Sequence, residues 1–234
     1  MIENLIEKAK KDDKKVYIYA HKFPDGDAIS SSCAIVEYLK NTGIDASYVI
    51  TNPITLYSEV FGEIPTTQSV TSDSISLILD TSTLNYAENT LFLSSKPGDT
   101  YVIDHHIKQN GATCIEDELN VPQSNVIRDS SASSTCEILL NELAREKISP
   151  QIANMLTLGL MTDTAKLKFL KPTTLQNLQT LLQLGAYYNN ILSVCNKKSH
   201  LRDEVGLAKI LLKSKRINIG DTFGLILSLE AMKI

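Results

Sequence analysis

The chain has 234 residues, a length that fits one large domain or one domain followed by part of another. Hydrophobic residues make up 43% of it, so it can bury a sizeable core. Its formal net charge of -4 argues against a protein that coats long nucleic acid with a basic surface. A small anionic substrate, held by metal ions or by a local patch, is compatible with this charge.

The cysteines and the N-terminus predict a cytoplasmic protein. None of the four cysteines belongs to a CxxC pair, so we expect reduced thiols. The N-terminal stretch "MIENLIEKAKKDDKK" is charged throughout and lacks the apolar centre of a signal peptide. No apolar run approaches the roughly 20 residues that a membrane-spanning helix needs, so we expect no membrane association.

Short apolar runs alternate with amphipathic segments along the chain. The first run, 16–20, is rich in β-branched and aromatic residues, as is typical of a buried parallel strand. An expected helix, 28–43, follows it and closes at Gly43, a common C-terminal capping residue. The remaining expected elements are strands at 46–50, 75–80, 100–104 and, more weakly, 125–128, and helices at 133–147, 149–164 and 173–186.

This alternation predicts an α/β fold, with a mostly parallel sheet of about five strands and helices on both faces. We expect this domain to span residues 1–190. In the remainder, 191–234, the basic segment 196–216 predicts a linker helix and 223–231 predicts one more strand. This part is expected to be the start of an incomplete second unit. The basic residues of 196–216 are better explained as a solvated helix face than as phosphate ligands.

Polar side chains follow three of the predicted strands, at the carboxyl ends where parallel α/β sheets collect ligands. A further carboxylate, Asp163, interrupts a markedly apolar helical segment, and a buried charge there needs a partner. Three of the four histidines belong to this set. The strand-end residues, in chain order, are His21, Asp25, Asp27, Asp80, Asp104, His105 and His106.

This cluster predicts a site for divalent cations, because carboxylates without counter-ions would repel one another. Asp and His ligands without cysteine favour Mn²⁺ or Mg²⁺, with Fe²⁺, Co²⁺ or Zn²⁺ as alternatives. The ligands are too many for one open metal site, so we expect two metals that share a bridging carboxylate. Taken singly, the residues have plainer explanations: Asp27 could cap the following helix, and His21 could be structural.

At these residues the chain resembles the DHH phosphoesterase superfamily. The motif that names the family occurs as "VIDHHIK", and the first motif occurs as "AHKFPDGDAISS". Asp80 in "LILDTS" and Asp163 in "GLMTDT" match the second and fourth motifs. All four occur in family order, and the resemblance covers roughly residues 1–190. Where the family commonly has glycine, this chain has Ser30 or Ser31 in the first motif and Ala165 after the fourth.

The resemblance implies how the ligands divide between two metals. Asp80 would bridge the metals and, with Asp104 and His106, is expected to be catalytic. His106 would face the substrate phosphate as hydrogen-bond donor or general acid, and Asp104 would orient the histidines. Ser133 and Ser134, in the serine-rich start of a helix, would bind substrate together with His106. One metal would be held by His21, Asp25 and Asp80, and the other by Asp27, Asp80, His105 and Asp163.

Within the superfamily, the chain looks most like the small bacterial oligoribonucleases (nano-RNases), which often also dephosphorylate 3′-phosphoadenosine 5′-phosphate. The implied reaction is hydrolysis of phosphodiester or phosphomonoester bonds in short oligonucleotides or small nucleotides, by in-line attack of a hydroxide that bridges two Mn²⁺ ions. The glycine- and histidine-rich loop of the family's second domain is missing, so we expect that domain to be truncated or absent. The resemblance is compatible with a homodimer.

Other functions stay open at this point. Within the enzymes, the chain could be a pyrophosphatase-like or cyclic-dinucleotide-cleaving member of the family. Outside them, it could be a binding module that retains metals but turns over little. A dinucleotide-binding protein is disfavoured, because no GxGxxG motif follows the first strand.

Overall fold

The computed structural model divides the chain into two compact units, Met1–Cys195 and Asn196–Ile234. The boundary expected at residue 190 falls inside helix α8 (Tyr188–Cys195), which belongs to the first unit. The structure describes residues 1–50, 57–87, 96–108, 111, 113–196, 215–219 and 222–226.

The described residues of the first unit form a six-stranded sheet in which every pair of neighbours is parallel. This confirms the predicted fold class. The sequence did not indicate β3, which pairs only two of its residues with β2. In sheet order the strands are β3 (Thr66–Thr67), β2 (Ala46–Val49), β1 (Lys15–Tyr19), β4 (Ser74–Leu79), β5 (Thr100–Asp104) and β6 (Val126–Arg128).

The chain reverses its direction of travel across the sheet between β3 and β4. It runs outward from β1 through β2 and β3, then crosses to the other side of β1 to add β4, β5 and β6. The carboxyl ends of β1 and β4 therefore flank the switch point, where open α/β sheets bind ligands. Tyr19 pairs with Ile78, and Leu79 pairs with Ile103, so the three central strands end at nearly the same level.

Capping residues decide where the main helices begin. Asp25 caps α2 by accepting hydrogen bonds from two backbone amides, so this helix starts at Gly26 rather than at the predicted residue 28. Ser149 caps α6, and Pro150 occupies its first turn, as predicted. The helices are α1 (Ile2–Asp12), α2 (Gly26–Asn41), α3 (Ser58–Phe61), α4 (Ile115–Glu118), α5 (Thr135–Glu142), α6 (Pro150–Asp163), α7 (Pro172–Gln183) and α8, with single 3₁₀ turns at Leu84–Tyr86, Pro97–Asp99, Gln123–Asn125 and Arg145–Lys147.

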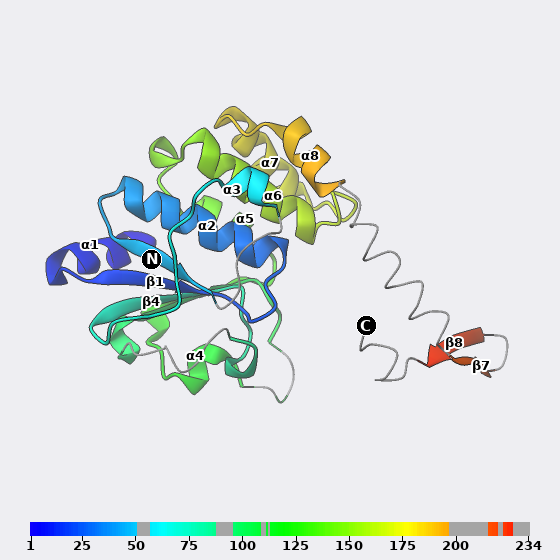
Figure 1. Ribbon diagram of the computed structural model, residues 1–234, viewed down its shortest axis with the longest axis horizontal. Helices are drawn as coiled ribbons and strands as arrows, with labels where there is room; N and C mark the ends of the chain where they lie inside the picture. Colours follow the sequence, from blue (N-terminus) through cyan, green and yellow to red (C-terminus); the bar gives the residue numbers. More distant parts are fainter. Residues whose placement is uncertain are drawn as a thin grey trace. The chain divides into compact units, whose positions relative to one another are not determined.

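Two hydrophobic cores lie on opposite faces of the sheet, because successive strand side chains alternate between the faces. Val16 and Ile18 enter the larger core, which also contains residues of α1, α2, α5, α6, α7 and α8. Tyr17 and Tyr19 enter the smaller core, together with Ile115 of α4. Figure 1 shows the resulting asymmetry, with α2 and α5 on one side of the sheet and α4 on the other. Helices therefore cover both faces, as predicted, but unequally.

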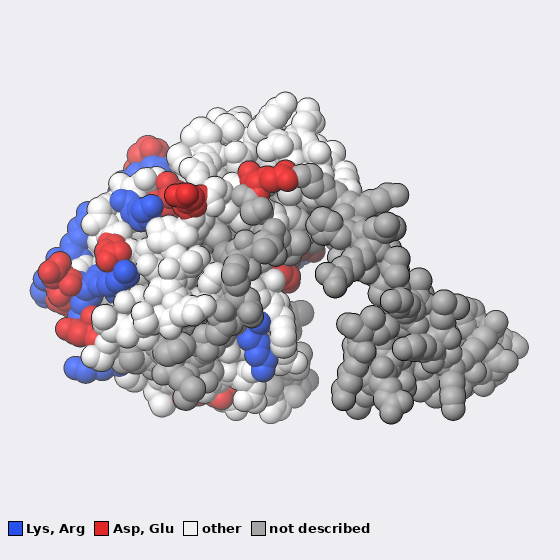
Figure 2. Space-filling view, viewed as in Figure 1, with Lys and Arg blue, Asp and Glu red and all other residues white. Residues whose placement is uncertain are grey.

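In the view of Figure 2, charged side chains gather around α1, whereas the surface over α6 and α7 carries few.

In the second unit, β7 (Lys215–Ile219) and β8 (Thr222–Ile226) form an antiparallel pair. The predicted linker helix 196–216 is wrong at its end, because residues 215 and 216 belong to β7; positions 197–214 lie outside the described residues. The strand predicted at 223–231 is present as β8, and positions 227–231 again lie outside them. Within the described parts of the chain, no helix has the length and apolar character to cross a membrane.

Candidate metal centre

The structure brings the predicted metal ligands together at the carboxyl end of the sheet. The loop after β1 supplies His21 and Asp25, the first turn of α2 supplies Asp27, and Asp80 directly follows β4. Two histidines follow the last residue of β5. Asp163 arrives from another layer of the molecule, as the last residue of α6. The side chains that approach one another are His21, Asp25, Asp27, Asp80, His105, His106 and Asp163.

Two groups of ligand atoms share the side chain of Asp80. In the first, His21 Nε2 lies 3.8 Å from Asp80 Oδ2 and 3.9 Å from Asp25 Oδ1. In the second, His105 Nε2 lies 3.4 Å from Asp80 Oδ1 and 3.2 Å from Asp163 Oδ2. Because the two oxygens of Asp80 face different histidines, this carboxylate is placed between the groups. Such oxygen and imidazole donors suit divalent cations.

Asp27 is fully buried and takes its hydrogen bonds from a helix other than its own. The backbone amides of Thr135 and Cys136, at the start of α5, donate to its two oxygens at 2.6 and 3.1 Å. The hydroxyl of Thr135 also donates to Asp80 Oδ1 at 3.0 Å. Since Asp25 caps α2, the alternative explanation of Asp27 as the cap of that helix is wrong.

Crowding of acidic groups shifts the protonation of this cluster. Burial, followed by the neighbouring carboxylates of Asp80 and Asp163, raises the pKa of Asp27 well above its usual range. Burial alone would lower the pKa of His105, but hydrogen bonds to Asp163 and Asp80 raise it to about 11. His105 Nε2 also lies 4.0 Å from Asp27 Oδ2. The cluster by itself therefore holds protons that a divalent cation would displace.

His106 stands at the rim of the centre, 46% exposed, and is held by the fully buried Asp104. Asp104 Oδ1 lies 2.7 Å from His106 Nδ1, and this hydrogen bond raises the pKa of His106. Arg128, the last residue of β6, donates to the other oxygen of Asp104 and also to both oxygens of Glu116, at 2.8 and 2.7 Å. Neither Arg128 nor Glu116 was predicted as part of the site, although Arg128 lies at the end of a predicted strand, as the other site residues do.

Left-handed backbone occurs at both Asp80 and the turn after Asp163. Asp80 has a φ of 50°, in a region that residues with a side chain rarely adopt. Ala165, Lys166 and Leu167 follow with φ values of 49°, 61° and 68°. Glycine adopts such angles without steric cost, which gives a physical reason for the family's preference for glycine at the position of Ala165.

Ser133 and Ser134 take part in the cap of α5. Ser134 is fully buried, and its hydroxyl accepts a hydrogen bond from the amide of Glu137 at 3.1 Å. The carboxylate of Glu137 accepts from the amide of Ser133 at 2.7 Å, in a variant of the capping box. The hydroxyl of Ser133 lies 2.7 Å from Thr174 Oγ1. This geometry gives both serines a structural role, and it does not support a substrate contact by Ser134, whose side chain has no exposed surface.

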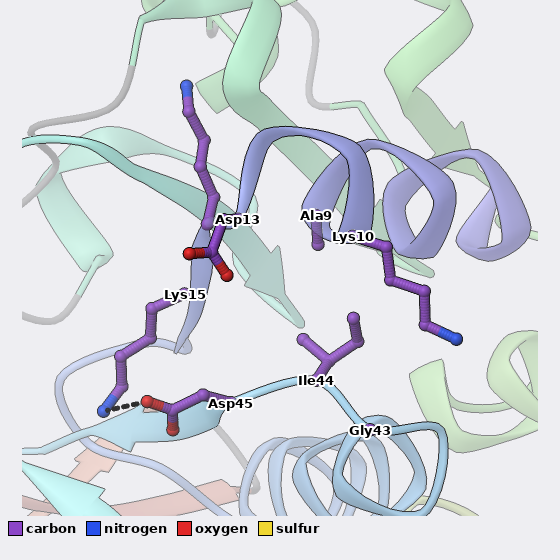
Figure 3. A pocket seen from close by; sticks show the side chains of 8 residues that line it. Ala9, Lys10, Asp13, Lys15, Gly43, Ile44 and Asp45 are labelled. Atoms are coloured by element: carbon purple, nitrogen blue, oxygen red, sulfur yellow. Dashed lines mark ion pairs between the residues drawn. The ribbon is translucent and has the colours of Figure 1, made fainter.

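A hollow lies at the opposite edge of the sheet, where β1 and β2 begin (Figure 3). Lys15 Nζ pairs there with Asp45 Oδ2 at 3.2 Å, and Lys14 pairs with Asp73 and Asp99 at 2.9 and 3.0 Å. These carboxylates compensate the charge of both lysines, and the hollow is separate from the metal centre. Its lining residues are Ala9, Lys10, Asp13, Lys14, Lys15, Gly43, Ile44 and Asp45.

The fold and this cluster define an α/β protein with a site for divalent cations built from aspartates and histidines. The family model described as the DHH family, N-terminal domain, matches residues 15–160. The chain therefore belongs to the DHH family, as its motifs predicted. A search of curated proteins found no match for the chain.

Two proteins of known structure are among those that match the chain. An exopolyphosphatase-related protein from Bacteroides fragilis matches with a TM-score of 0.67 and 20% sequence identity, over 91% of this chain. The chain covers 66% of that protein, which is just under two thirds of its length. CDC45 from Entamoeba histolytica matches with a TM-score of 0.44 and 20% identity. The match covers 78% of this chain and 36% of the CDC45 chain. The first of these likenesses supports the fold.

Proposed function

We propose that the chain is a divalent-metal-dependent phosphoesterase that hydrolyses phosphodiester or phosphomonoester bonds of short oligonucleotides or small nucleotides. Membership of the DHH family supports a metal-dependent phosphoesterase. The observation that carries the proposal is the position of Asp80, whose two carboxylate oxygens face His21 and His105 respectively. The resemblance to nano-RNases favours nucleotides as the substrate class.

The donors fit two divalent cations per chain, and we propose Mn²⁺ because the set combines carboxylates with imidazoles and contains no thiolate. One ion would be held by His21 and Asp25, and the other by Asp27, His105 and Asp163. Asp80 would contribute to both. When bound, such ions neutralise charge on phosphoryl oxygens and lower the pKa of a coordinated water. The protein's part is to fix the donors, as the amides at the start of α5 do for the second group.

We propose His106 as the general acid toward the leaving oxygen. Its Nδ1 is engaged by Asp104, so Nε2 is the nitrogen from which a proton can be transferred. The raised pKa of His106 favours the protonated ring that a general acid requires. Burial opposes ionisation of Asp104, but His106 and Arg128 lower its pKa, so the carboxylate stays charged and keeps the imidazole in place.

The alternatives are separated by substrate and by metal content. A pyrophosphatase-like member would hydrolyse pyrophosphate, and a cyclic-dinucleotide phosphodiesterase would open a cyclic dinucleotide. A binding module would retain two metals without turnover. The name of the Bacteroides protein keeps polyphosphate among the substrates worth testing.

Purified protein with Mn²⁺ should be given an RNA dinucleotide, 3′-phosphoadenosine 5′-phosphate, a cyclic dinucleotide, pyrophosphate and polyphosphate. Hydrolysis of either of the first two supports the proposal; two bound metals without any hydrolysis would favour the binding module. Asp80→Ala should lose both metal and activity, whereas Asp45→Ala, at the opposite edge of the sheet, should keep both. His106→Ala should keep the metals and lose about 10²–10⁴-fold in rate. Full activity in His106→Ala would refute the proposed general acid.

A further inference from the structure

Two exposed aromatic residues belong to the segments that carry ligands of the metal centre. Phe23 is 77% exposed and lies in the loop after β1, between the candidate ligands His21 and Asp25. Tyr86 is 59% exposed and follows β4, six positions after Asp80. Both rings thus sit on the two segments that flank the switch point of the sheet.

Hydrogen bonds hold these two segments together. The backbone amide of Lys22 donates to the carbonyl oxygen of Tyr86 at 2.8 Å, and His21 forms an antiparallel bridge with Ala87. The position of each ring is therefore tied to the backbone that carries His21. A displacement of this loop would move the rings and the metal ligand together.

The ammonium group of Lys22 lies near both rings. Its Nζ is 5.9 Å from the centroid of Phe23 and 6.0 Å from the centroid of Tyr86, within the range of cation–π attraction. Both rings therefore lie near one positive charge, on segments that also carry acidic ligands of the centre. That combination suits a ligand that carries both an anionic group and a flat π-face.

We propose that Phe23 and Tyr86 form a platform that stacks a nucleobase of the substrate while its phosphate lies at the metal centre. This inference rests on the proposed phosphoesterase function and deepens it by assigning the residues that select nucleotides. Every base offers a π-face, so such a platform tolerates different bases. Lys22 favours an anionic ligand and disfavours a cationic one. The occupant is therefore a nucleoside joined to phosphate rather than a basic peptide.

The test compares an adenylyl dinucleotide with an analogue that lacks both bases. Removal of one ring by Phe23→Ala or Tyr86→Ala should raise KM for the dinucleotide about tenfold relative to the abasic analogue, as expected for loss of one stacked base. Phe23→Trp should restore the preference, because it replaces one aromatic face with another. Tyr187→Ala is the matched control, since Tyr187 is 64% exposed but lies after α7, where its amide contacts Asn154.

Equilibrium binding of the same two compounds is then measured with Ca²⁺ in place of Mn²⁺. This measurement tests the stacking platform separately from the proposed enzyme function. If the wild type prefers the dinucleotide and Phe23→Ala loses that preference, the platform stands even when nothing is hydrolysed. If the wild type binds both compounds equally, or if both aromatic variants keep the wild-type preference, the platform is refuted. If the platform is refuted but the enzyme still hydrolyses the dinucleotide, the phosphoesterase proposal remains intact.

Discussion

The backbone amide of Thr135 lies 2.6 Å from Asp27 Oδ2, so the first residue of α5 holds a buried carboxylate that belongs to α2. The hydroxyl of the same threonine lies 3.0 Å from Asp80 Oδ1. Thr135 thus supports one carboxylate of the second ligand group and the carboxylate that both groups share. Partners of this kind orient metal ligands and tune their affinity.

Thr135→Val should weaken Mn²⁺ binding about 10–100-fold, because it removes the hydroxyl donor to Asp80 while keeping the shape of the side chain. Isothermal titration calorimetry of the metal-stripped protein measures this change. Thr135→Ser is the control, since it keeps the hydroxyl and the amide. Equal affinities for the two variants would show that the hydroxyl does not support the ligand.

Arg128→Leu should destabilise the protein by up to about 3–5 kcal/mol, because the buried Asp104 loses its guanidinium partner and keeps His106. Urea unfolding measures the loss. Arg128→Lys keeps the charge but lacks the guanidinium fork that reaches both Asp104 and Glu116. The stability of this variant should therefore lie between those of the wild type and Arg128→Leu. An Arg128→Leu protein with the wild-type unfolding midpoint would contradict this role.

Gly159→Ala should lower stability by about 1–3 kcal/mol and weaken metal binding, because its new methyl group would overlap with Cys136 Sγ and lie 2.7 Å from Asp27 Oδ1. Thermal unfolding and metal titration report the two effects. Gly98→Ala is the control, since nothing lies within 4 Å of the added carbon there. A Gly159→Ala protein that binds Mn²⁺ as tightly as the control would show that α2 and α6 can separate without disturbing Asp27.

Ala165→Gly should stabilise the protein by about 1 kcal/mol, because Ala165 is exposed and has a φ of 49°, which costs a residue with a Cβ roughly 1–2 kcal/mol. Ala144→Gly, at an ordinary φ of -64°, should instead destabilise it by about 0.4–1 kcal/mol through the added freedom of the unfolded chain. Chemical denaturation compares the two. Equal losses of stability would show that the turn after Asp163 carries no strain.

Mn²⁺ binding should tighten as pH rises. The pKa of His105 is raised to about 11 without a cation, so at pH 7 the imidazolium must lose a proton before its Nε2 can bind metal. One displaced proton makes affinity rise about tenfold per pH unit between about pH 6 and 8. The raised pKa of His105 also stabilises the metal-free fold. This contribution is fully present below pH 6.5 and is lost as pH rises toward 11. Titration in buffers of different ionisation enthalpy counts the released protons, and an affinity independent of pH would contradict the prediction.

Much of the fold could be predicted because its strands are short apolar runs between turn residues. The four central strands end within one residue of the predicted positions. Helix α1 was not predicted, because its apolar stripe of Ile2, Leu5, Ile6 and Ala9 is narrow and lies in a charged segment. Strand β3 was missed because two residues carry no periodic pattern.

The candidate ligands could be predicted for a similar reason. Each follows a recognisable strand or interrupts an apolar helix, as Asp163 does, and parallel strands end at a common edge. Their hydrogen-bond partners could not be predicted in this way. In the sequence, Ser134 looks the same whether it binds phosphate or caps a helix. Only its burial and its hydrogen bond with the amide of Glu137 distinguish these two roles.

The sequence by itself determined which side chains reach the carboxyl edge of the sheet, because strand ends and turns are local properties. Only the tertiary structure decided what holds those side chains. Thr135 supports Asp27 across 108 positions of the chain, and Arg128 pairs with Asp104 from a neighbouring strand. Such contacts depend on how α5 packs against α2 and how β6 joins β5, and both arrangements follow from burial of the whole core rather than from any local pattern.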